Sequence, residues 1–175
     1  MPYCPIVGTL AYVWDRARDR VLLVHRTARA DDEHLGKYNG LGGKLEADED
    51  VVSSLRRELR EEAAIELTDF ALRGTVSWPG FGAHGEDWLG FVVLVQAWQG
   101  TVPTANAEGT LSWVPRPRLL AACEADETVA TEAALPMWEG DRFFLPLVFD
   151  DDPRPFWGVM PYAHGRPVDW RCCRA

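Results

Sequence analysis

Two apolar segments near the start of the chain have the pattern of β-strands. Residues 5–14 and 21–25 are rich in β-branched and aromatic side chains, and the charged residues 15–20 separate them. We expect these two segments to form a hairpin. Apolar segments of similar character follow at residues 71–78, 89–98, 110–114 and 156–162.

The segment from residue 48 to residue 63 has the pattern of an amphipathic helix. It contains no glycine or proline, and its apolar side chains recur at intervals of three and four residues: Val52, Leu55, Leu59 and Ala63. Three carboxylates, at residues 48–50, stand where they can cap the free amides at the start of a helix. Two alanine-rich segments, residues 117–123 and 128–135, predict shorter helices.

Composition is consistent with this pattern. The chain has 175 residues, of which 47% are hydrophobic and 26% charged, as is usual for a globular domain. Strands interspersed with helices predict one α/β sandwich that spans residues 1–175. No apolar run approaches the length of a membrane span, and no signal-like segment opens the chain, so we expect a cytoplasmic protein without membrane contact. Four cysteines without C-x-x-C spacing predict reduced thiols.

Charge argues against one class of partner. The net charge of −9 disfavours binding to duplex nucleic acid, which requires many basic residues to neutralise phosphates. Most of the acidic residues lie in two blocks, residues 46–66 and 124–152. Acidic blocks are usually solvated faces, so only a geometric argument makes one of them a cation site.

The predicted helix gathers three glutamates on one side. At about 100° per residue, Glu58, Glu61 and Glu62 share an arc of about 100° that adjoins the apolar stripe. Like charges this close repel each other, so the helix gains no stability by gathering them, whereas a bound cation would supply a reason. Oxygen ligands select hard ions such as Mg²⁺ or Mn²⁺, and Mg²⁺ keeps positions open for water and phosphate oxygens.

The same glutamates have a second interpretation. They can pair on a solvated surface with the arginines of the same helix, Arg56, Arg57 and Arg60. The glycine-rich residues 36–44 favour the cation, because a glycine turn that enters an acidic helix offers backbone carbonyls and leaves room for a phosphate chain. This segment is neither a P-loop nor a G-x-G-x-x-G motif.

The segment that joins the glycine turn to the helix has a distinctive spacing. Gly43 is followed after five residues by Glu49, and after seven more by Arg57-Glu58-Leu59-Arg60-Glu61-Glu62-Ala63-Ala64-Ile65. This spacing closely resembles the Nudix box: a glycine, a spaced glutamate, Arg-Glu, an aliphatic residue, any residue, Glu-Glu, any residue, a glycine and an aliphatic residue. The one departure is Ala64, where the family has glycine. If that glycine ends the helix in a left-handed conformation, alanine costs on the order of 1 kcal/mol there; otherwise the helix continues another turn.

The resemblance implies a fold, a cofactor and a reaction. The fold is the Nudix α/β/α sandwich with a mixed sheet, and the cofactor is Mg²⁺ or Mn²⁺. The family's metal ligands map onto Glu58, Glu61 and Glu62, with the carbonyl of Gly43 and the later loop acid Glu108 as further ligands. The family hydrolyses nucleoside diphosphates linked to another moiety, through attack of water on phosphorus.

Two further assignments rest on the same resemblance. Glu49 would pair with Arg57 and brace the loop against the helix, outside the metal's own ligands. Spacing does not distinguish which of Glu61, Glu62 and Glu108 is the general base that takes a proton from the attacking water.

Outside the box, the chain resembles the MutT-type enzymes, which hydrolyse oxidised purine triphosphates such as 8-oxo-dGTP to the monophosphate and pyrophosphate. That branch's glycine-rich loop carries an asparagine that binds the base, which maps onto Asn39, and Lys44 joins the expected substrate-binding residues. A tryptophan–acid segment of the branch maps onto Trp138, which would stack on the purine, and Asp141, which would read its edge. Gly140 stands where some relatives have a second acid, which leaves the base selectivity open.

Several alternatives stay open at this point. Asparagine beside glycines is common in turns, so Asn39 has a structural interpretation as well. The box is blind to the substrate's other moiety, so a dinucleoside polyphosphate, NADH or ADP-ribose is an alternative substrate. A nucleotide-binding module without catalysis is a further alternative. A monomer or a homodimer is expected, with a nucleotide as the partner.

Overall fold

A computed structural model describes residues 2–82, 84–124 and 135–175 of the chain. Within them, the helices are α1 (Val51–Ala63), α2 (Arg116–Glu124) and α3 (Asp141–Phe149). The long strands are β1 (Ile6–Asp15), β2 (Arg20–Arg26), β4 (Glu66–Phe81), β5 (Glu86–Gln99) and β6 (Gly109–Pro115). The short strands are β3 (Tyr38–Asn39), β7 (Phe156–Val159), β8 (Tyr162–Ala163), β9 (Arg166–Pro167) and β10 (Arg171–Arg174).

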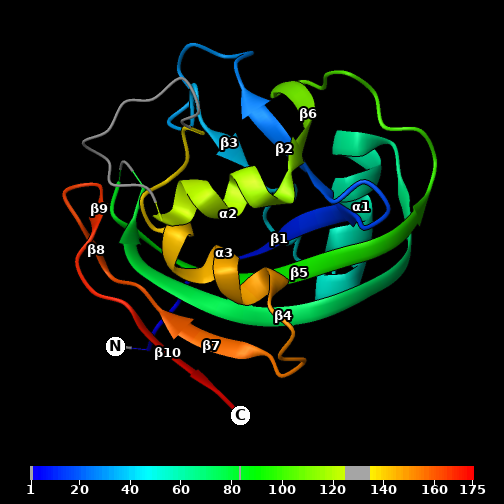
Figure 1. Cartoon of the computed structure of the whole chain (residues 1–175). Coiled ribbons are helices and arrows are strands. Elements are labelled where there is room, and N and C mark those ends of the chain that lie inside the picture. Colours follow the sequence, from blue (N-terminus) through cyan, green and yellow to red (C-terminus); the bar gives the residue numbers. More distant parts are fainter. Residues whose placement is uncertain (1, 83, 125–134) are drawn as a thin grey trace.

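The main sheet is mixed. Among the described residues it has eight strands in the order β10-β7-β4-β5-β1-β2-β3, and β6 pairs with β2 (Figure 1). The strand pairs β1–β5 and β4–β7 are parallel, whereas the other neighbouring pairs are antiparallel. The predicted hairpin of β1 and β2 is present. No helix in the described part of the chain is both long enough and apolar enough to span a membrane.

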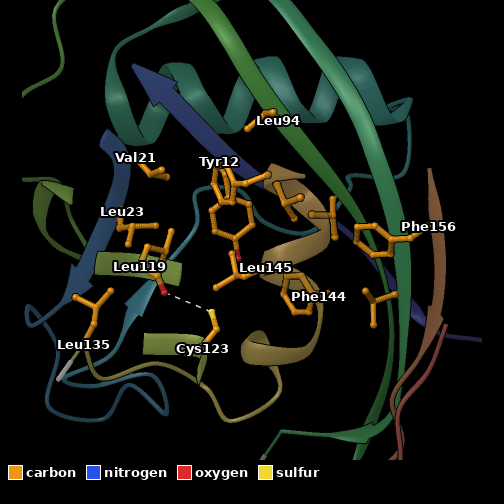
Figure 2. Packing of buried hydrophobic residues seen from close by; sticks show 14 of the residues in the cluster. Tyr12, Val21, Leu23, Leu94, Leu119, Cys123, Leu135, Phe144, Leu145 and Phe156 are labelled. Carbon is orange, nitrogen blue, oxygen red and sulfur yellow. Dashed lines mark hydrogen bonds between the residues drawn. The ribbon is translucent and has the colours of Figure 1, made fainter. Parts of the chain in front are cut away.

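Helices cover both faces of this sheet. Successive side chains of a strand point to opposite faces, and β1 shows this alternation clearly. Tyr12 packs with α2 and α3 in one cluster, which Figure 2 shows, whereas Ala11 and Val13 pack against α1 in the other. In Figure 1, α2 and α3 lie on one side of the sheet and α1 on the other. The predicted α/β/α sandwich is therefore confirmed.

Helix α1 begins later than predicted, and its end decides a question that the sequence left open. It begins at Val51 instead of residue 48, because Asp50 is the N-cap and its side chain accepts the N–H groups of Val52 and Ser53. Val52 was predicted to be buried but is 39% exposed, since the first turn lies beyond the edge of the core. The helix ends at Ala64, whose φ of 55° is left-handed, and this decides between the two alternatives for that position.

Three other expectations need correction. Strand β4 is longer than the predicted 71–78, because its pairing with β5 continues through several bulges. Strand β7 ends at Val159, before the predicted residue 162. Helix α3 was not predicted at all, because Pro146 lies inside it and no side chain caps its start. The helix predicted at 128–135 falls almost entirely on residues 125–134, outside the described residues.

A buried arginine holds the end of α3. Arg73, on β4, is 6% exposed and donates to the carbonyl oxygens of Leu147, Val148 and Asp150 at 3.2, 2.8 and 3.0 Å. Carbonyls at the C-terminal end of a helix lack partners within the helix, so the guanidinium satisfies them and opposes the negative end of the helix dipole. These hydrogen bonds hold α3 in place, and α3 begins at Asp141, the residue predicted to read the edge of the base.

Candidate active site

A cleft of about 670 Å³ opens between the glycine-rich loop and the C-terminal third of the chain. Its walls come from β1, the loop after β2, the β4–β5 hairpin and the segment leading into α3. Several residues predicted from the sequence line it: Asn39, Gly43, Lys44, Glu108, Trp138 and Asp141. The fold therefore brings distant parts of the chain together at one concave surface.

Two box glutamates of α1 lie against the glycines of the cleft wall. The backbone N–H of Gly42 donates to Oε2 of Glu62 at 2.8 Å. A Cβ atom at Gly43 would lie 2.5 Å from Oε1 of Glu58, which is closer than real Cβ contacts. Glycine at position 43 therefore lets the loop lie against the Glu58 carboxylate of α1. On its other side, the loop is hydrogen-bonded to Thr9 of β1.

Burial changes the acidity of these two carboxyls. It raises the pKa of Glu62 to about 8; the hydrogen bond from Gly42 opposes this shift, and the negative charges of Glu108 and Glu58 add to it. Burial also raises the pKa of Glu58, and the bound guanidinium of Arg57 opposes that shift. Both carboxylates would thus gain from a nearby positive charge.

The third box glutamate points elsewhere. The side chain of Glu61 is 61% exposed, and its Oε2 lies 3.4 Å from Nη1 of Arg57. None of the three box glutamates is itself among the residues that line the cleft, but Gly42 and Gly43, which contact Glu62 and Glu58, do line it. Around the helix, Glu61 lies about 60° from Glu58 and about 100° from Glu62, which is enough to turn it toward solvent.

Glu49 and Arg57 are brought together as the sequence predicted. The guanidinium donates from Nε and Nη2 to the two carboxylate oxygens of Glu49 at 2.6 and 2.8 Å. It also donates to Glu58 at 2.9 Å and to the carbonyl oxygen of Lys44 at 3.2 Å. These hydrogen bonds hold the pKa of Glu49 at about 2. One guanidinium thus ties the loop before α1 to a glutamate in the middle of the helix.

Glu108 reaches the cleft from the loop before β6. Its carboxylate pairs with Arg26, and Arg29 lies 3.8 Å away. Asn106 orders this loop, because its Oδ1 accepts the N–H groups of Glu108 and Gly109 at 2.9 and 3.0 Å. Its Nδ2 donates to the carbonyl oxygen of Glu62 at 3.1 Å.

Asn106 was missed from the sequence. The run Asn106-Ala107-Glu108-Gly109 is typical of a turn closed by an asparagine side chain, and that signal was available. The contact with Glu62, 44 residues away in the chain, was not available. Asn106 therefore joins the loop of Glu108 to the end of α1.

The oxygen atoms of the acidic residues around Gly43 are suitable ligands for a hard divalent cation. Within residues 2–82, 84–124 and 135–175, no three histidine, cysteine, aspartate or glutamate side chains are gathered as a formed metal site, since arginines pair with Glu58 and Glu108. The available ligand atoms are all oxygens, as Mg²⁺ and Mn²⁺ prefer. The carbonyl oxygen of Gly43 accepts the N–H of Thr9 at 2.9 Å and keeps a second lone pair. The close approach at Gly43 places the backbone of this residue beside the Glu58 carboxylate.

The opposite end of the cleft is aromatic. The Trp138 ring meets Phe81 edge to face, with 5.2 Å between ring centroids, and Nζ of Lys37 lies 4.6 Å from the Trp138 centroid. Lys44 lies similarly over Trp88, with Nζ 5.1 Å from the ring centroid. The two lysines that flank the glycine-rich segment therefore each lie over a tryptophan ring near the cleft.

Asp141 is the first residue of α3 and also faces the cleft. Its backbone N–H donates to the carbonyl oxygen of Trp138 at 3.0 Å, which fixes the two residues relative to each other. Burial raises the pKa of its carboxyl to about 7. A carboxyl with this pKa exists in both protonation states near neutral pH, so it can donate as well as accept a hydrogen bond.

Three buried polar atoms that belong to cleft-lining residues lack a hydrogen-bond partner among the described residues. They are Oγ1 of Thr9, Oδ1 of Asn39 and Nε1 of Trp88. Buried polar groups in folded proteins are almost always paired, so such a group needs an explanation. All three belong to residues that line one cleft, where a polar ligand or an ordered water could complete their hydrogen bonds.

Comparison with known proteins agrees with this geometry. The model of the NUDIX domain family matches residues 5–134. This chain belongs to the Nudix family. A curated relative, the uncharacterised Nudix hydrolase YvcI of Bacillus subtilis (strain 168), is 31% identical over 97 residues. That match covers 54% of this chain and 58% of the relative, so the chain spans little more than half of the relative's length.

Solved structures of Nudix proteins share the fold. The MutT protein from Bacillus halodurans superimposes with a TM-score of 0.75 at 24% identity, over 95% of this chain and 97% of that one. The MutT NUDIX hydrolase from Burkholderia pseudomallei gives a TM-score of 0.55 at 27% identity, over 75% of this chain and 94% of that one. The first of these likenesses extends over almost the whole of both chains, the C-terminal elements beyond the family match included.

Proposed function

We propose that this chain is a metal-dependent nucleoside triphosphate pyrophosphohydrolase. Its substrates would be oxidised purine nucleotides such as 8-oxo-dGTP, cleaved to the monophosphate and pyrophosphate. The observation that carries the proposal is that one cleft is lined by Gly42, Gly43 and Glu108 and also by Trp138, Asn39 and Asp141, with the carboxylates of Glu58 and Glu62 against the two glycines. A purine nucleotide has the same division into an anionic chain and a flat polar ring.

The acidic end would bind the phosphate chain. Glu58 and Glu62, with Glu108 and the carbonyl of Gly43, would hold Mg²⁺ or Mn²⁺, which when bound neutralises phosphate oxygens and acidifies a water. Glu61 would join these ligands by turning its exposed side chain away from Arg57. The protein itself supplies the positions of these groups. Arg57 fixes the loop against α1, and Gly42 orients the Glu62 carboxylate. We place the general base among Glu61, Glu62 and Glu108.

The aromatic end would bind the base. The Trp138 ring lines the cleft and would stack on the base, and base stacking on an aromatic side chain contributes about 1–3 kcal/mol. The unpaired Oδ1 of Asn39 accepts a hydrogen bond, and the Asp141 carboxyl can donate or accept one. These polar atoms suit the edge of a purine that carries both N–H and carbonyl groups. Lys44, near the junction of the two ends, would contact the phosphate chain.

The test is a substrate panel with product identification. Canonical and oxidised nucleoside triphosphates, dinucleoside polyphosphates, NADH and ADP-ribose are each incubated with the protein and Mg²⁺. We expect faster hydrolysis of oxidised purine triphosphates, with release of pyrophosphate. Comparable rates on all purine triphosphates would remove the preference for oxidised bases, and a preference for another nucleoside diphosphate derivative would reassign the substrate.

One substitution in α1 separates catalysis from binding. Glu62→Gln keeps the shape of the side chain and an oxygen for the Gly42 N–H, but removes the negative charge. We expect kcat to fall by about 10²- to 10⁴-fold while nucleotide binding survives. Tight nucleotide binding by the wild type without turnover of any substrate would instead identify a binding module.

A further inference from the structure

One ring nitrogen lies between the two predicted base-binding residues. His34, in the loop between β2 and β3, places its Nδ1 2.7 Å from Nε1 of Trp138 and 2.9 Å from Nδ2 of Asn39. The His34 and Trp138 rings meet edge to face, with centroids 5.3 Å apart. His34 also lines the cleft.

These contacts determine the protonation of the imidazole. The indole Nε1 is only a donor, so Nδ1 of His34 must accept and cannot carry a proton. The ring proton of the neutral imidazole then lies on Nε2, which is 3.6 Å from Oε1 of Glu33. Burial lowers the pKa of His34, and the charge of Arg26 lowers it further, against the smaller opposing effects of Glu33, Asp32 and Glu108. The neutral state is thus favoured.

The unprotonated nitrogen also determines which way the Asn39 amide faces. Its NH₂ group points to Nδ1, because an amide oxygen in that place would face another lone pair. Oδ1 therefore points away from His34, where it is buried and has no hydrogen-bond partner among the described residues. An acceptor in this state needs an N–H or O–H donor, which a ligand in the cleft can supply.

The loop that carries His34 is itself anchored to the acidic end of the cleft. The backbone N–H of His34 donates to Oδ1 of Asp32 at 3.0 Å, and Oδ2 of Asp32 accepts from Nε of Arg26 at 2.7 Å. Arg26 in turn pairs with Glu108. The contacts of Asp32 with His34 and Arg26 therefore fix the backbone that carries the imidazole.

We propose that His34 is a positioning residue for the base end of the cleft. Its Nδ1 holds the indole of Trp138 and fixes the Asn39 amide with its oxygen free, so that the cleft selects a base that presents an N–H donor. This inference rests on the proposed function, and in it His34 acts on the substrate only through Trp138 and Asn39.

Two substitutions separate the acceptor from the ring. His34→Phe keeps an aromatic ring against Trp138 but removes the acceptor, whereas His34→Asn removes the ring and keeps an oxygen near the place of Nδ1. With 8-oxo-dGTP as substrate, we expect His34→Phe to raise KM about tenfold and to leave kcat within about twofold. His34→Asn should bring KM back to within about threefold of the wild type. An unchanged KM in His34→Phe, or equal increases in both variants, would overturn the proposal.

A measurement without substrate keeps this test separate from that of the proposed function. In ligand-free protein with ¹⁵N-labelled histidine and tryptophan, we expect His34 to show an unprotonated Nδ1 and a protonated Nε2. The indole N–H signal of Trp138, assigned by its loss in Trp138→Phe, should move in His34→Phe and largely return in His34→Asn. A proton on Nδ1, or an indole signal that does not respond, would overturn the proposal. If the wild type hydrolyses no nucleotide, the proposed function fails and this measurement alone decides the role of His34.

Discussion

The backbone N–H of Gly42 and the carboxylate of Glu62 are joined by a hydrogen bond of 2.8 Å, although the two residues are 20 positions apart in the chain. Gly42 has a φ of 128°, which residues other than glycine rarely adopt. A Cβ atom at this position would also clash with the carbonyl oxygen of Thr9. The position of the Glu62 carboxylate thus depends on a glycine in a different element.

This dependence predicts a severe effect of Gly42→Ala. The backbone conformation is strained for alanine and the added methyl group meets backbone, so we expect a loss of about 3 kcal/mol or more in the free energy of unfolding. Gly36→Ala is the matched control, because Gly36 also has a positive φ but has open space around it, and it should cost only about 1 kcal/mol. Urea denaturation measures both values, and equal losses would contradict the prediction.

Replacement of the residue that departs from the box should stabilise the protein. Ala64 has a left-handed conformation at the end of α1, so Ala64→Gly relieves strain and should raise the free energy of unfolding by about 1 kcal/mol. The same substitution at Ala121, exposed within α2, should lower it by about 1 kcal/mol. Thermal or urea unfolding of both variants checks the opposite signs.

Removal of the Trp138 ring should affect binding more than folding. The ring faces the cleft and packs on Phe81 with one edge, so Trp138→Ala removes the stacking surface while leaving the main apolar clusters intact. We expect KM for the purine nucleotide to rise about tenfold or more, with a smaller proportional effect on unfolding. Steady-state kinetics and thermal unfolding are compared, and an unaltered KM would show that the ring does not stack on substrate.

Asp141 should make stability depend on pH in an unusual direction. Its carboxyl has a pKa of about 7 in the folded protein, above the value of about 3.9 of an unfolded chain, so the folded state binds the extra proton between these pH values. The free energy of unfolding therefore falls as the pH rises from about 4 to about 7, and the loss is complete above that range.

The variant Asp141→Asn removes this contribution. The carboxyl faces the cleft, so solvent there screens part of the effect of its raised pKa. We therefore expect the free energy of unfolding of the variant, relative to that of the wild type, to rise on the order of 2 kcal/mol between pH 4 and pH 8. The measurement is the difference between the two free energies of unfolding across this range. Parallel profiles of wild type and variant would contradict the raised pKa.

The sequence predicted those features that depend on local pattern. The spacing of Leu55 and Leu59 in α1 reports which face of the helix is buried, and that face was found as expected. Helix α3 escaped prediction because Pro146 disfavours a helix, and its end is held by Arg73 from a distant strand. No local pattern contains that contact.

The candidate site divides in the same way. The Nudix box lies within one segment, so the resemblance to it was enough to predict the pairing of Glu49 with Arg57, which is present. His34 was not predicted, because its importance comes from Trp138, 104 residues later in the chain. Residues whose role depends on a partner far along the chain have no signature in a single sequence.

The parallel pairing of β1 with β5 has a consequence for synthesis of the chain. Ile6 is aligned with Trp88 and Val13 with Val95, so β1 is synthesised well before β5, and the edge of β1 that pairs with β5 stays uncovered until then. Closing so long a loop slows folding, and an unpaired apolar edge invites association with other chains. Nascent chains that stop within β4 should therefore aggregate, and those that extend beyond β5 should be protected.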